Sequence, residues 1–281
     1  MPRKRSIWKL HDREIQLGDN TLLAGVLNVT PDSFFDGGQF FDPDKAYARA
    51  LQLEEQGADL IDIGAESTRP GAIRIEEEEE IRRLIPVLKR LRGKLAIPIS
   101  VDTYKASVAA RALELGAEII NDPSGLTFDP NLAKVVCQFN AGLILNHMRG
   151  TPDSWARLGP LPDASGTVRR ELDACIHRAR HSSIDLLRVV IDPGLGFGKR
   201  KDESTRLIAD LRQLEMLNLP IHIGPSRKSF LAQLTPEANL MATAAAVTAC
   251  VLNGAHIVRV HDVAEMVPVI QVADSILRAA P

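Results

Sequence analysis

Eight short apolar runs recur along the chain, and stretches with helical spacing separate them. The runs occupy residues 22–29, 60–65, 97–103, 118–123, 142–148, 189–194, 220–226 and 256–262. Runs that are apolar throughout predict parallel strands that are buried on both faces of a sheet. Three helical stretches end in Gly-Ala, which favours a helix end just before the next strand. Eight strand–helix units in about 250 residues predict an α/β fold of the (β/α)8 TIM barrel type.

An open, doubly wound sheet is the alternative fold, because it uses the same alternation of strands and helices. Residues 6–20 precede the first unit, and we expect them to form a short hairpin that closes the bottom of the barrel. No linker or low-complexity segment interrupts the repeats. We therefore expect residues 1–20 to be a tail with this hairpin and residues 21–281 to be a single barrel domain.

Charge and cysteine content exclude several classes of protein. A formal net charge of −2 provides no general attraction for nucleic acid or an acidic membrane, so neither is an expected partner. No run approaches the 18 apolar residues or so that a membrane span needs. Cys137, Cys175 and Cys250 lie far apart, which argues against a zinc site or a disulfide framework and favours a reducing cytoplasm.

The stretch "IDPGLGFGKR" at 191–200 resembles a loop that binds nucleotide phosphate, but its spacing does not fit either known pattern. A P-loop requires glycine where this chain has Pro193, and Ser or Thr where it has Arg200. In a dinucleotide-binding fingerprint that starts at Gly194, the third glycine falls on Lys199. These glycines therefore serve another purpose.

Polar side chains gather at the ends of the predicted strands. They are Asn28, Asp62, Asp102, Asn121, Asp122, Asn146, His147, Asp192, Arg259, His261 and Asp262. In a TIM barrel the active site lies at the C-terminal ends of the strands and in the loops that follow. Any one of these residues can be a loop cap, but the whole set predicts an active site. By contrast, the run "EEEEE" at 76–80 is typical of the first turn of a helix, here one spanning about 76–91.

The residue types indicate the kind of substrate. Carboxylates and an amide at Asp102, Asn121 and Asp192 suit a flat heterocycle with a guanine-like edge of amine, ring N–H and carbonyl. A set of basic residues is expected to attract an anion such as pyrophosphate: Arg69, Arg227, Lys228, Arg259 and His261. Asn28 and carboxylates of the first loop can complete a Mg²⁺ site with phosphate oxygens. No motif suggests a covalent nucleophile, which favours direct group transfer.

Seven motifs in this order resemble the dihydropteroate synthase family. They are "NVTPDSFFDGG", "ESTRPGA", "SVDT", "IIND", "DPGLGFGK", "SRKSF" and "RVHD", which together span residues 28 to 262. Single motifs such as "SVDT" are weakly specific. The two loop motifs "NVTPDSFFDGG" and "ESTRPGA", taken together with "DPGLGFGK" and "SRKS", are highly specific. The resemblance implies a barrel that joins 4-aminobenzoate to 6-hydroxymethyl-7,8-dihydropterin diphosphate in folate synthesis, releasing pyrophosphate.

The resemblance also implies roles for individual residues. Those implied for the pterin, with Asp192 accepting the amine and ring N–H, are Asp102, Asn121, Asp192 and Lys228. Those implied for the diphosphate are Asn28, Thr68, Arg259 and His261. Arg69, Pro70 and Phe197 frame the aminobenzoate site, and Gly224 and Arg227 complete the substrate-binding set. Asn28 and Asp36 are the implied Mg²⁺ ligands, and the implied catalytic residues are Lys228, Asp102, Arg259, His261 and Asp36.

On this interpretation pyrophosphate leaves first, and the weakly nucleophilic amine of 4-aminobenzoate then captures the pterin cation. Gly37, Gly38 and Gly71 are expected to let the first two loops close over the site. The glycines of "DPGLGFGK" are expected to let the backbone and Phe197 approach the substrates, and Lys199 is expected to be peripheral. The family resemblance further suggests a homodimer.

The chain departs from the family pattern at Asn146, Pro123, Phe35 and Pro225. Asn146 stands before a histidine, where the family often has an apolar residue. None of these departures removes a residue with an implied chemical role. Two other functions remain open. A pterin-dependent corrinoid methyltransferase would not need the motifs "ESTRP", "SRKS" and "RVHD", and a non-catalytic pterin-binding paralogue would be expected to lack first-loop or cationic residues.

Overall fold

Eight parallel strands form a closed barrel in the computed structural model, which describes residues 3–30, 42–67 and 71–279. The strands are β3 (Leu22–Asn28), β4 (Leu60–Gly64), β5 (Ile99–Asp102), β6 (Ile119–Asp122), β7 (Gly142–Asn146), β8 (Val189–Asp192), β9 (His222–Ile223) and β10 (Ile257–Val260). They pair in the order β8-β7-β6-β5-β4-β3-β10-β9. A bridge between Ile191 and Ile221 joins the two ends of this order. Closure confirms the predicted TIM barrel and excludes the open sheet.

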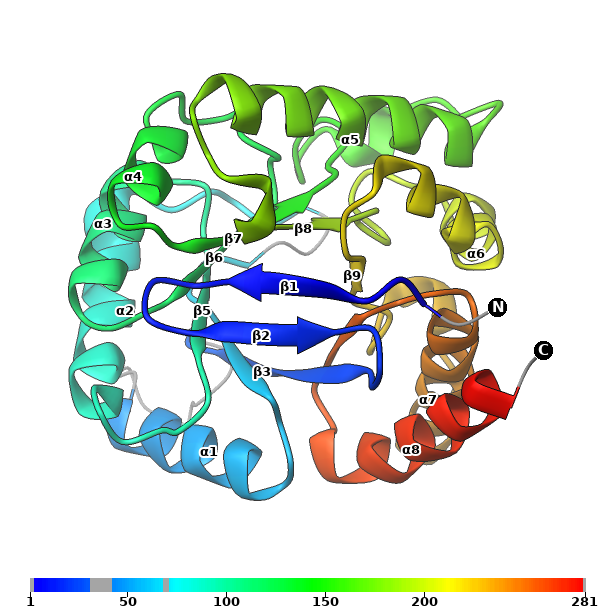
Figure 1. The fold of residues 1–281 in the computed structure, drawn as a ribbon, viewed down its shortest axis with the longest axis horizontal. Helices are drawn as coiled ribbons and strands as arrows, with labels where there is room; N and C mark the ends of the chain where they lie inside the picture. The colour runs from blue at the N-terminus through cyan, green and yellow to red at the C-terminus, as the bar shows by residue number, and fades with distance from the viewer. Residues whose placement is uncertain (1–2, 31–41, 68–70, 280–281) are drawn as a thin grey trace.

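Helices cover the outside of the barrel, as the ring around the strands in Figure 1 shows. They are α1 (Pro43–Glu55), α2 (Glu77–Leu91), α3 (Ala106–Glu114), α4 (Leu132–Gln138), α5 (Ala164–His181), α6 (Lys201–Ala209), α7 (Pro236–Leu252) and α8 (Val263–Ala279). Gly57, Gly116 and Gly254 follow three of them with φ of +100°, a left-handed conformation that glycine adopts without strain. The predicted Gly-Ala helix ends are therefore confirmed. Within the described ranges, no helix is long and apolar enough to cross a membrane.

An antiparallel hairpin precedes the barrel, as the sequence predicts. Its strands β1 (Ser6–Lys9) and β2 (Glu14–Leu17) cross the barrel in Figure 1. Trp8 and Leu17 of the hairpin pack with a cluster of residues from the first halves of six barrel strands: Ala24, Leu60, Ile119, Ile144, Val190 and Ile257. The indole N–H of Trp8 donates to the carbonyl of Arg188 at 2.8 Å. The hairpin thus covers the apolar amino-terminal end of the barrel interior.

The apolar contacts of Trp8 predict a large stability effect. Because the side chain is fully buried, we expect Trp8→Ala to lower the free energy of unfolding by about 3–5 kcal/mol. Urea denaturation followed by circular dichroism measures this loss. Ile7, the next residue on the same strand, is 37% exposed, and Ile7→Ala is expected to cost less than about 1 kcal/mol. Equal losses in the two variants would contradict this account of the hairpin.

Strand register brings the polar residues together at the opposite end of the interior. Side chains on a strand alternate between its faces, and register partners in a parallel sheet share a face. Asp102 is paired with both Gly64 and Asn121, and Asn146 is paired with Asp192. Apolar residues therefore fill the end of the barrel beneath the hairpin, and acids, amides and bases fill the carboxyl end.

Candidate active site

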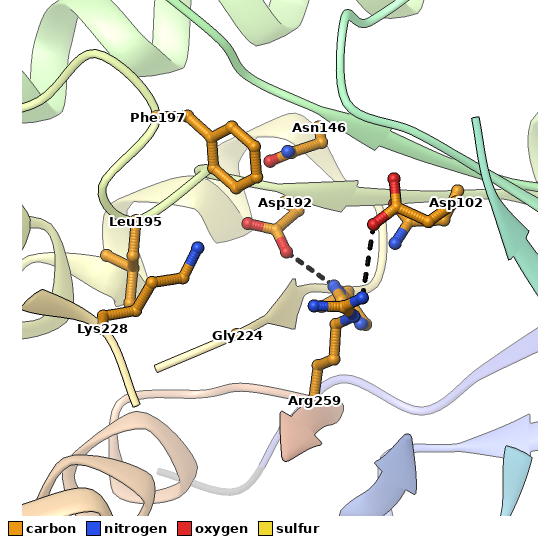
Figure 2. Close-up of a pocket in the computed structure, with 10 residues that line it drawn as sticks. Asp102, Asn146, Asp192, Leu195, Phe197, Gly224, Lys228 and Arg259 are labelled. Carbon is orange, nitrogen blue, oxygen red and sulfur yellow. Dashed lines mark hydrogen bonds and ion pairs between the residues drawn. The ribbon is translucent and has the colours of Figure 1, made fainter. Parts of the chain in front are cut away.

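A pocket lies at the carboxyl ends of the strands (Figure 2). It is lined by Asp102, Asn121, Asn146, Asp192, Leu195, Phe197, His222, Gly224, Lys228 and Arg259. Seven of these ten residues belong to the substrate-binding set expected from the sequence. The structure thus brings together residues from six strands and from the loops after β8 and β9. We call this the inner pocket.

A wider cleft adjoins the inner pocket and shares five of its lining residues: Asp102, Phe197, Gly224, Lys228 and Arg259. Its further polar lining includes Asn28, Glu66, Ser67, Arg227 and His261. The inner pocket and this outer cleft adjoin through the residues that they share, and acidic, amide and basic groups line both. Such a site can hold a polar ring in the inner pocket and an anion in the outer cleft.

Arg259 is held between two carboxylates in the barrel. Its guanidinium donates to Asp62 at 2.5 Å and to Asp102 at 3.2 Å, the second of which is drawn in Figure 2. Burial is the largest single influence on the pKa of Asp62 and raises it, but the charge and hydrogen bond of Arg259, together with the Ser100 hydroxyl, keep that pKa below its ordinary value. At Asp102 burial dominates, and the neighbouring Asp62 adds to it, so the pKa rises to about 7. Asp102 is therefore near the midpoint of its titration at neutral pH.

Asp192 is a buried carboxylate that the surrounding groups orient. One oxygen accepts from the backbone N–H of Gly194 at 2.6 Å, and the other lies 2.6 Å from Nδ1 of His222. A carboxylate oxygen can accept more than one hydrogen bond, so both oxygens can still take N–H groups of a ligand. The geometry suits bidentate recognition of an amine and a ring N–H.

Lys228 brings a second cation to the pocket, with Nζ lying 4.3 Å from the ring centre of Phe197. It makes no ion pair with any residue in the described ranges. Burial, together with the charge of Arg259, lowers the pKa of Lys228 to about 8. This lysine is therefore mostly protonated at pH 7 and available to a ligand.

One expectation about the basic groups needs correction. His261 was expected to be a cation, but burial and the positive charges of Arg259 and Arg227 lower its pKa to about 3, so it is neutral at pH 7. Its Nδ1 lies 3.0 Å from the hydroxyl of Ser226. Arg227 lines the outer cleft but forms an ion pair with Asp262. Arg259 and Lys228 thus supply the partly buried positive charge of the described site.

The glycine-rich loop after β8 packs closely against a neighbouring loop. Gly194, Gly196 and Gly198 all have positive φ, which confirms a tight loop. A Cβ on Gly194 would lie 1.9 Å from the carbonyl oxygen of His147, and one on Gly198 would lie 2.2 Å from that of Arg149. These two glycines therefore permit close packing against the neighbouring loop.

Lys199 is buried but lines neither the inner pocket nor the outer cleft, which agrees with the expectation that it is peripheral to substrate binding. Its ammonium donates to the carbonyls of His147, Gly194 and Phe197 at 3.1, 2.7 and 3.2 Å. Burial lowers the pKa of Lys199 to about 7. These three hydrogen bonds stabilise the loop that carries Phe197.

Two polar residues at strand ends have structural roles. Asp122 accepts from the backbone N–H groups of Ser124 and Leu126, and so caps the loop after β6. His147 pairs with Glu171 of α5 at 2.6 Å. Both residues therefore stabilise loops and do not line the inner pocket. Loop stabilisation is the alternative role that any single strand-end residue can have.

Three residues contribute to the site without an individual predicted role: His222, which was not among the predicted site residues, and Asp62 and Asn146, which were predicted only as members of the set of strand-end polar residues. Asp62 fixes Arg259 and also accepts from the Asn121 amide at 3.1 Å. His222 lies beside Asp192, and Asn146 lines the inner pocket. The available signal was their position, since each lies within or at the end of an apolar strand, where an inward polar side chain is costly unless it is paired.

Part of the predicted site lies outside the described residues. These residues are Asp36, Thr68, Arg69 and Pro70, together with Gly37 and Gly38 of the first loop. Asn28 is described and lies at the end of β3. A Cβ on Gly64 would be 3.9 Å from Oδ1 of Asn28 and 3.7 Å from Oδ2 of Asp102, so the two oxygens flank the same glycine. The described residues contain no group of three or more His, Cys, Asp or Glu residues able to hold a metal ion.

Residues 24–261 match a family model described as pterin binding enzyme, and this match covers every barrel strand except the first two residues of β3. Barrel and pocket thus define the class as pterin-binding enzymes. A dihydropteroate synthase from Synechocystis is 41% identical over 265 residues, which cover 93% of this chain and 92% of that protein. Within the class, the chain belongs to the dihydropteroate synthase family.

Solved structures agree with this assignment. The dihydropteroate synthase of Xanthomonas albilineans with 4-aminobenzoic acid has a TM-score of 0.90 and 38% identity, covering 99% of this chain and 100% of that one. The same enzyme in complex with 7,8-dihydropteroate has a TM-score of 0.86 and 36% identity, with 98% and 100% covered. The resemblance seen in the sequence motifs therefore extends over the whole fold.

Proposed function

We propose that this site condenses 6-hydroxymethyl-7,8-dihydropterin diphosphate with 4-aminobenzoate, giving 7,8-dihydropteroate and pyrophosphate. The observation that carries the proposal is the oriented, buried Asp192 in a pocket that two partly buried cations, Lys228 and Arg259, also line. The solved relative binds 4-aminobenzoic acid in one structure and 7,8-dihydropteroate in another, which supports the same substrates here.

In the proposed complex the pterin ring occupies the inner pocket. Asp192 accepts the amine and ring N–H, while Asp102, Asn121 and Lys228 bind the remaining polar atoms of the ring. Phe197, which lines both the inner pocket and the outer cleft, packs between the pterin and aminobenzoate positions. A polar pocket of this kind discriminates strongly, because a ligand that lacks one partner leaves a buried group unpaired.

The diphosphate lies in the outer cleft beside Arg259. Departure of pyrophosphate from the methylene carbon places negative charge on the leaving oxygens, which Arg259 and Lys228 stabilise, and the pterin ring delocalises the positive charge that remains. The aminobenzoate amine then attacks that carbon and loses a proton. Asn28, Arg227 and His261 line the cleft near the leaving group. Thr68, Arg69 and Pro70 complete the proposed substrate contacts, and Gly224 leaves room for the substrates.

We also propose Mg²⁺ as the cofactor, held by Asn28 and Asp36 together with diphosphate oxygens. Amide and carboxylate oxygens suit this ion, which usually keeps few protein ligands when it binds a phosphate substrate. Bound there, Mg²⁺ would neutralise charge on the leaving pyrophosphate. The small number of described donors near Asn28 is consistent with a site that the substrate completes.

Product formation tests the proposed function. The purified chain is incubated with both substrates and Mg²⁺, and dihydropteroate is detected by mass spectrometry alongside released pyrophosphate. We expect equal amounts of the two products. Pterin binding without turnover would favour a non-catalytic paralogue, and methyl transfer from a methylated folate to a corrinoid would favour a methyltransferase.

Removal of metal provides a separate prediction. With excess chelator, we expect pyrophosphate release to fall by at least tenfold, because the leaving group loses its strongest charge stabilisation. Titration of Mg²⁺ back into the assay should restore the rate, and Ca²⁺ serves as the control ion. A rate that is unchanged in chelator would contradict the roles of Asn28 and Asp36.

The lowered pKa of Lys228 predicts how substrate binding depends on pH. Lys228 is protonated below pH 8 and loses its charge as the pH rises above that value. The KM for pterin diphosphate should therefore rise above about pH 8, while the KM for 4-aminobenzoate changes little. Steady-state kinetics from pH 7 to 9.5 measure both constants. In Lys228→Met the KM for pterin diphosphate should be high and should lose this rise, and persistence of the rise would assign it to another group.

We further propose that residues 21–281 form one catalytic domain and that the chain works in the cytoplasm as a homodimer. Exposed apolar side chains on α7 and α8 support a self-association surface, namely Met241, Val272 and Ile276. Light scattering on the purified chain measures the oligomeric state. A mass twice that of the chain supports the dimer, and a monomer at all concentrations contradicts it.

A further inference from the structure

Asn146 occupies a position in the inner pocket beside the group proposed to recognise the pterin. It is the last residue of β7, and its register partner on β8 is Asp192. Register partners in a parallel sheet share a face, so both side chains enter the barrel interior. Figure 2 shows Asn146, Asp192 and Phe197 around the same space. The carboxamide is therefore placed to meet whatever Asp192 binds.

The carboxamide of Asn146 is buried and incompletely satisfied. The side-chain oxygen has no hydrogen-bond partner in the described part of the chain, although the residue is only 5% exposed. Exchanging the positions of the amide oxygen and nitrogen would leave a buried N–H₂ without a partner instead. Buried polar groups in native proteins are nearly always paired, because an unpaired one costs free energy that an apolar side chain avoids.

Most other polar groups of the inner pocket have a partner among the described residues, although Nε2 of His222 also lacks one. Asp102 and Asp62 bind Arg259, and Asp192 is held by Gly194 and His222. Unlike Asp102 and Asp192, Asn146 has a buried side-chain oxygen without a partner, and the residue also departs from the apolar residue that is common at this position in the family. A buried polar side chain without a partner destabilises the ligand-free protein. Such a side chain is expected at a binding site, where the ligand completes the hydrogen bonds of the side chain.

We propose that Asn146 is a specificity-determining residue that hydrogen-bonds the pyrimidine edge of the pterin, next to the amine and ring N–H accepted by Asp192. This inference rests on the proposed function for the identity of the ring. The edge presents an amine N–H and a carbonyl on either side of the atoms that Asp192 binds, and a carboxamide can serve either of them. An aliphatic residue here would give the pterin only apolar contact.

The test uses Asn146→Leu, which keeps nearly the same shape and removes the amide. Isothermal titration with pterin diphosphate alone is expected to show binding weakened roughly tenfold, the effect of one lost hydrogen bond in a closed pocket. The melting temperature of the ligand-free variant should be equal to or higher than that of the wild type, because an unpaired buried group has been removed. The KM for 4-aminobenzoate should not change. Asn131→Leu, an exposed amide on the loop before α4, is the matched control and should alter none of these quantities.

Two results with the Asn146→Leu variant would overturn the inference that Asn146 binds the pterin. Unchanged affinity for pterin diphosphate would show that Asn146 makes no contact with the ring, and a lower melting temperature with weaker binding would show a structural role. Should Asn146→Leu not fold, Asn146→Ser removes the amide with less volume and is measured in the same way. Titration does not depend on turnover, so an inactive wild type that still binds the pterin refutes only the proposed reaction. A wild type that does not bind the pterin refutes both.

Discussion

Asp192→Asn is expected to lower kcat/KM for pterin diphosphate by on the order of a thousandfold or more. The substitution keeps the shape of the side chain but replaces one acceptor oxygen with an N–H₂ group. That group cannot accept the pterin amine or ring N–H, and it also opposes the hydrogen bond from the Gly194 N–H or His222. Steady-state kinetics and titration with pterin diphosphate measure the loss.

Asp122→Asn is the matched control for this result. Asp122 is likewise a buried carboxylate at the end of a barrel strand, but its hydrogen bonds go to the Ser124 and Leu126 backbone of its own loop. We expect this variant to lose stability and to retain most of its affinity for the pterin. If the two variants lost affinity equally, recognition could not be attributed to Asp192.

Arg259→Met is expected to reduce both stability and activity. Removal of one partner from a buried ion pair leaves uncompensated charge, and here the carboxylates of Asp62 and Asp102 would both be left in the barrel. The loss in the free energy of unfolding should be about 3–5 kcal/mol. Turnover should fall by at least a hundredfold at saturating 4-aminobenzoate, because the leaving pyrophosphate loses a stabilising charge.

Urea denaturation separates the stability effect from the kinetic one. Arg227→Met is the control for stability, because the Arg227–Asp262 pair is largely exposed and such pairs contribute about 0–1 kcal/mol. A loss below about 1 kcal/mol in Arg259→Met would show that Asp62 and Asp102 do not depend on this guanidinium. Retained turnover would remove Arg259 from the proposed chemistry.

The fold could be predicted because its signals are local and repeated. Apolar runs at 22–29, 60–65 and six further places correspond to the eight strands, and glycines at helix ends have the expected left-handed conformation. The two-residue strand β9 is shorter than its apolar run, and a single bridge from Ile191 joins it to β8. The extent of pairing depends on neighbouring strands, which periodicity along the chain cannot specify.

The residues of the inner pocket could be predicted because a TIM barrel places strand ends together, but their pairing could not. Asp62 lies inside a strand, and only the barrel register reveals that it contacts Arg259 and Asn121. The acidic run at 76–80 likewise makes a contact that the sequence did not predict. Its last member, Glu80, is buried and binds Lys105 at 2.6 Å, although the sequence predicted only a charged first turn of α2.

Protonation states were the least predictable feature of the site. The sequence separated Lys199 from Lys228 by motif, but it gave no sign that His261 is neutral or that the pKa values of the two lysines are lowered. Burial lowers the pKa to about 3 for His261 and about 7 for Lys199, whereas that of Lys228 remains at about 8. These differences arise from desolvation and from neighbouring charges, which require three-dimensional positions.

A crystal structure of the chain with pterin diphosphate tests the central claim most directly. We predict that the pterin ring lies in the inner pocket, with its amine and ring N–H within hydrogen-bond distance of the Asp192 carboxylate and its diphosphate beside Arg259. A pterin bound elsewhere, or one that presents a different edge to Asp192, would contradict the account.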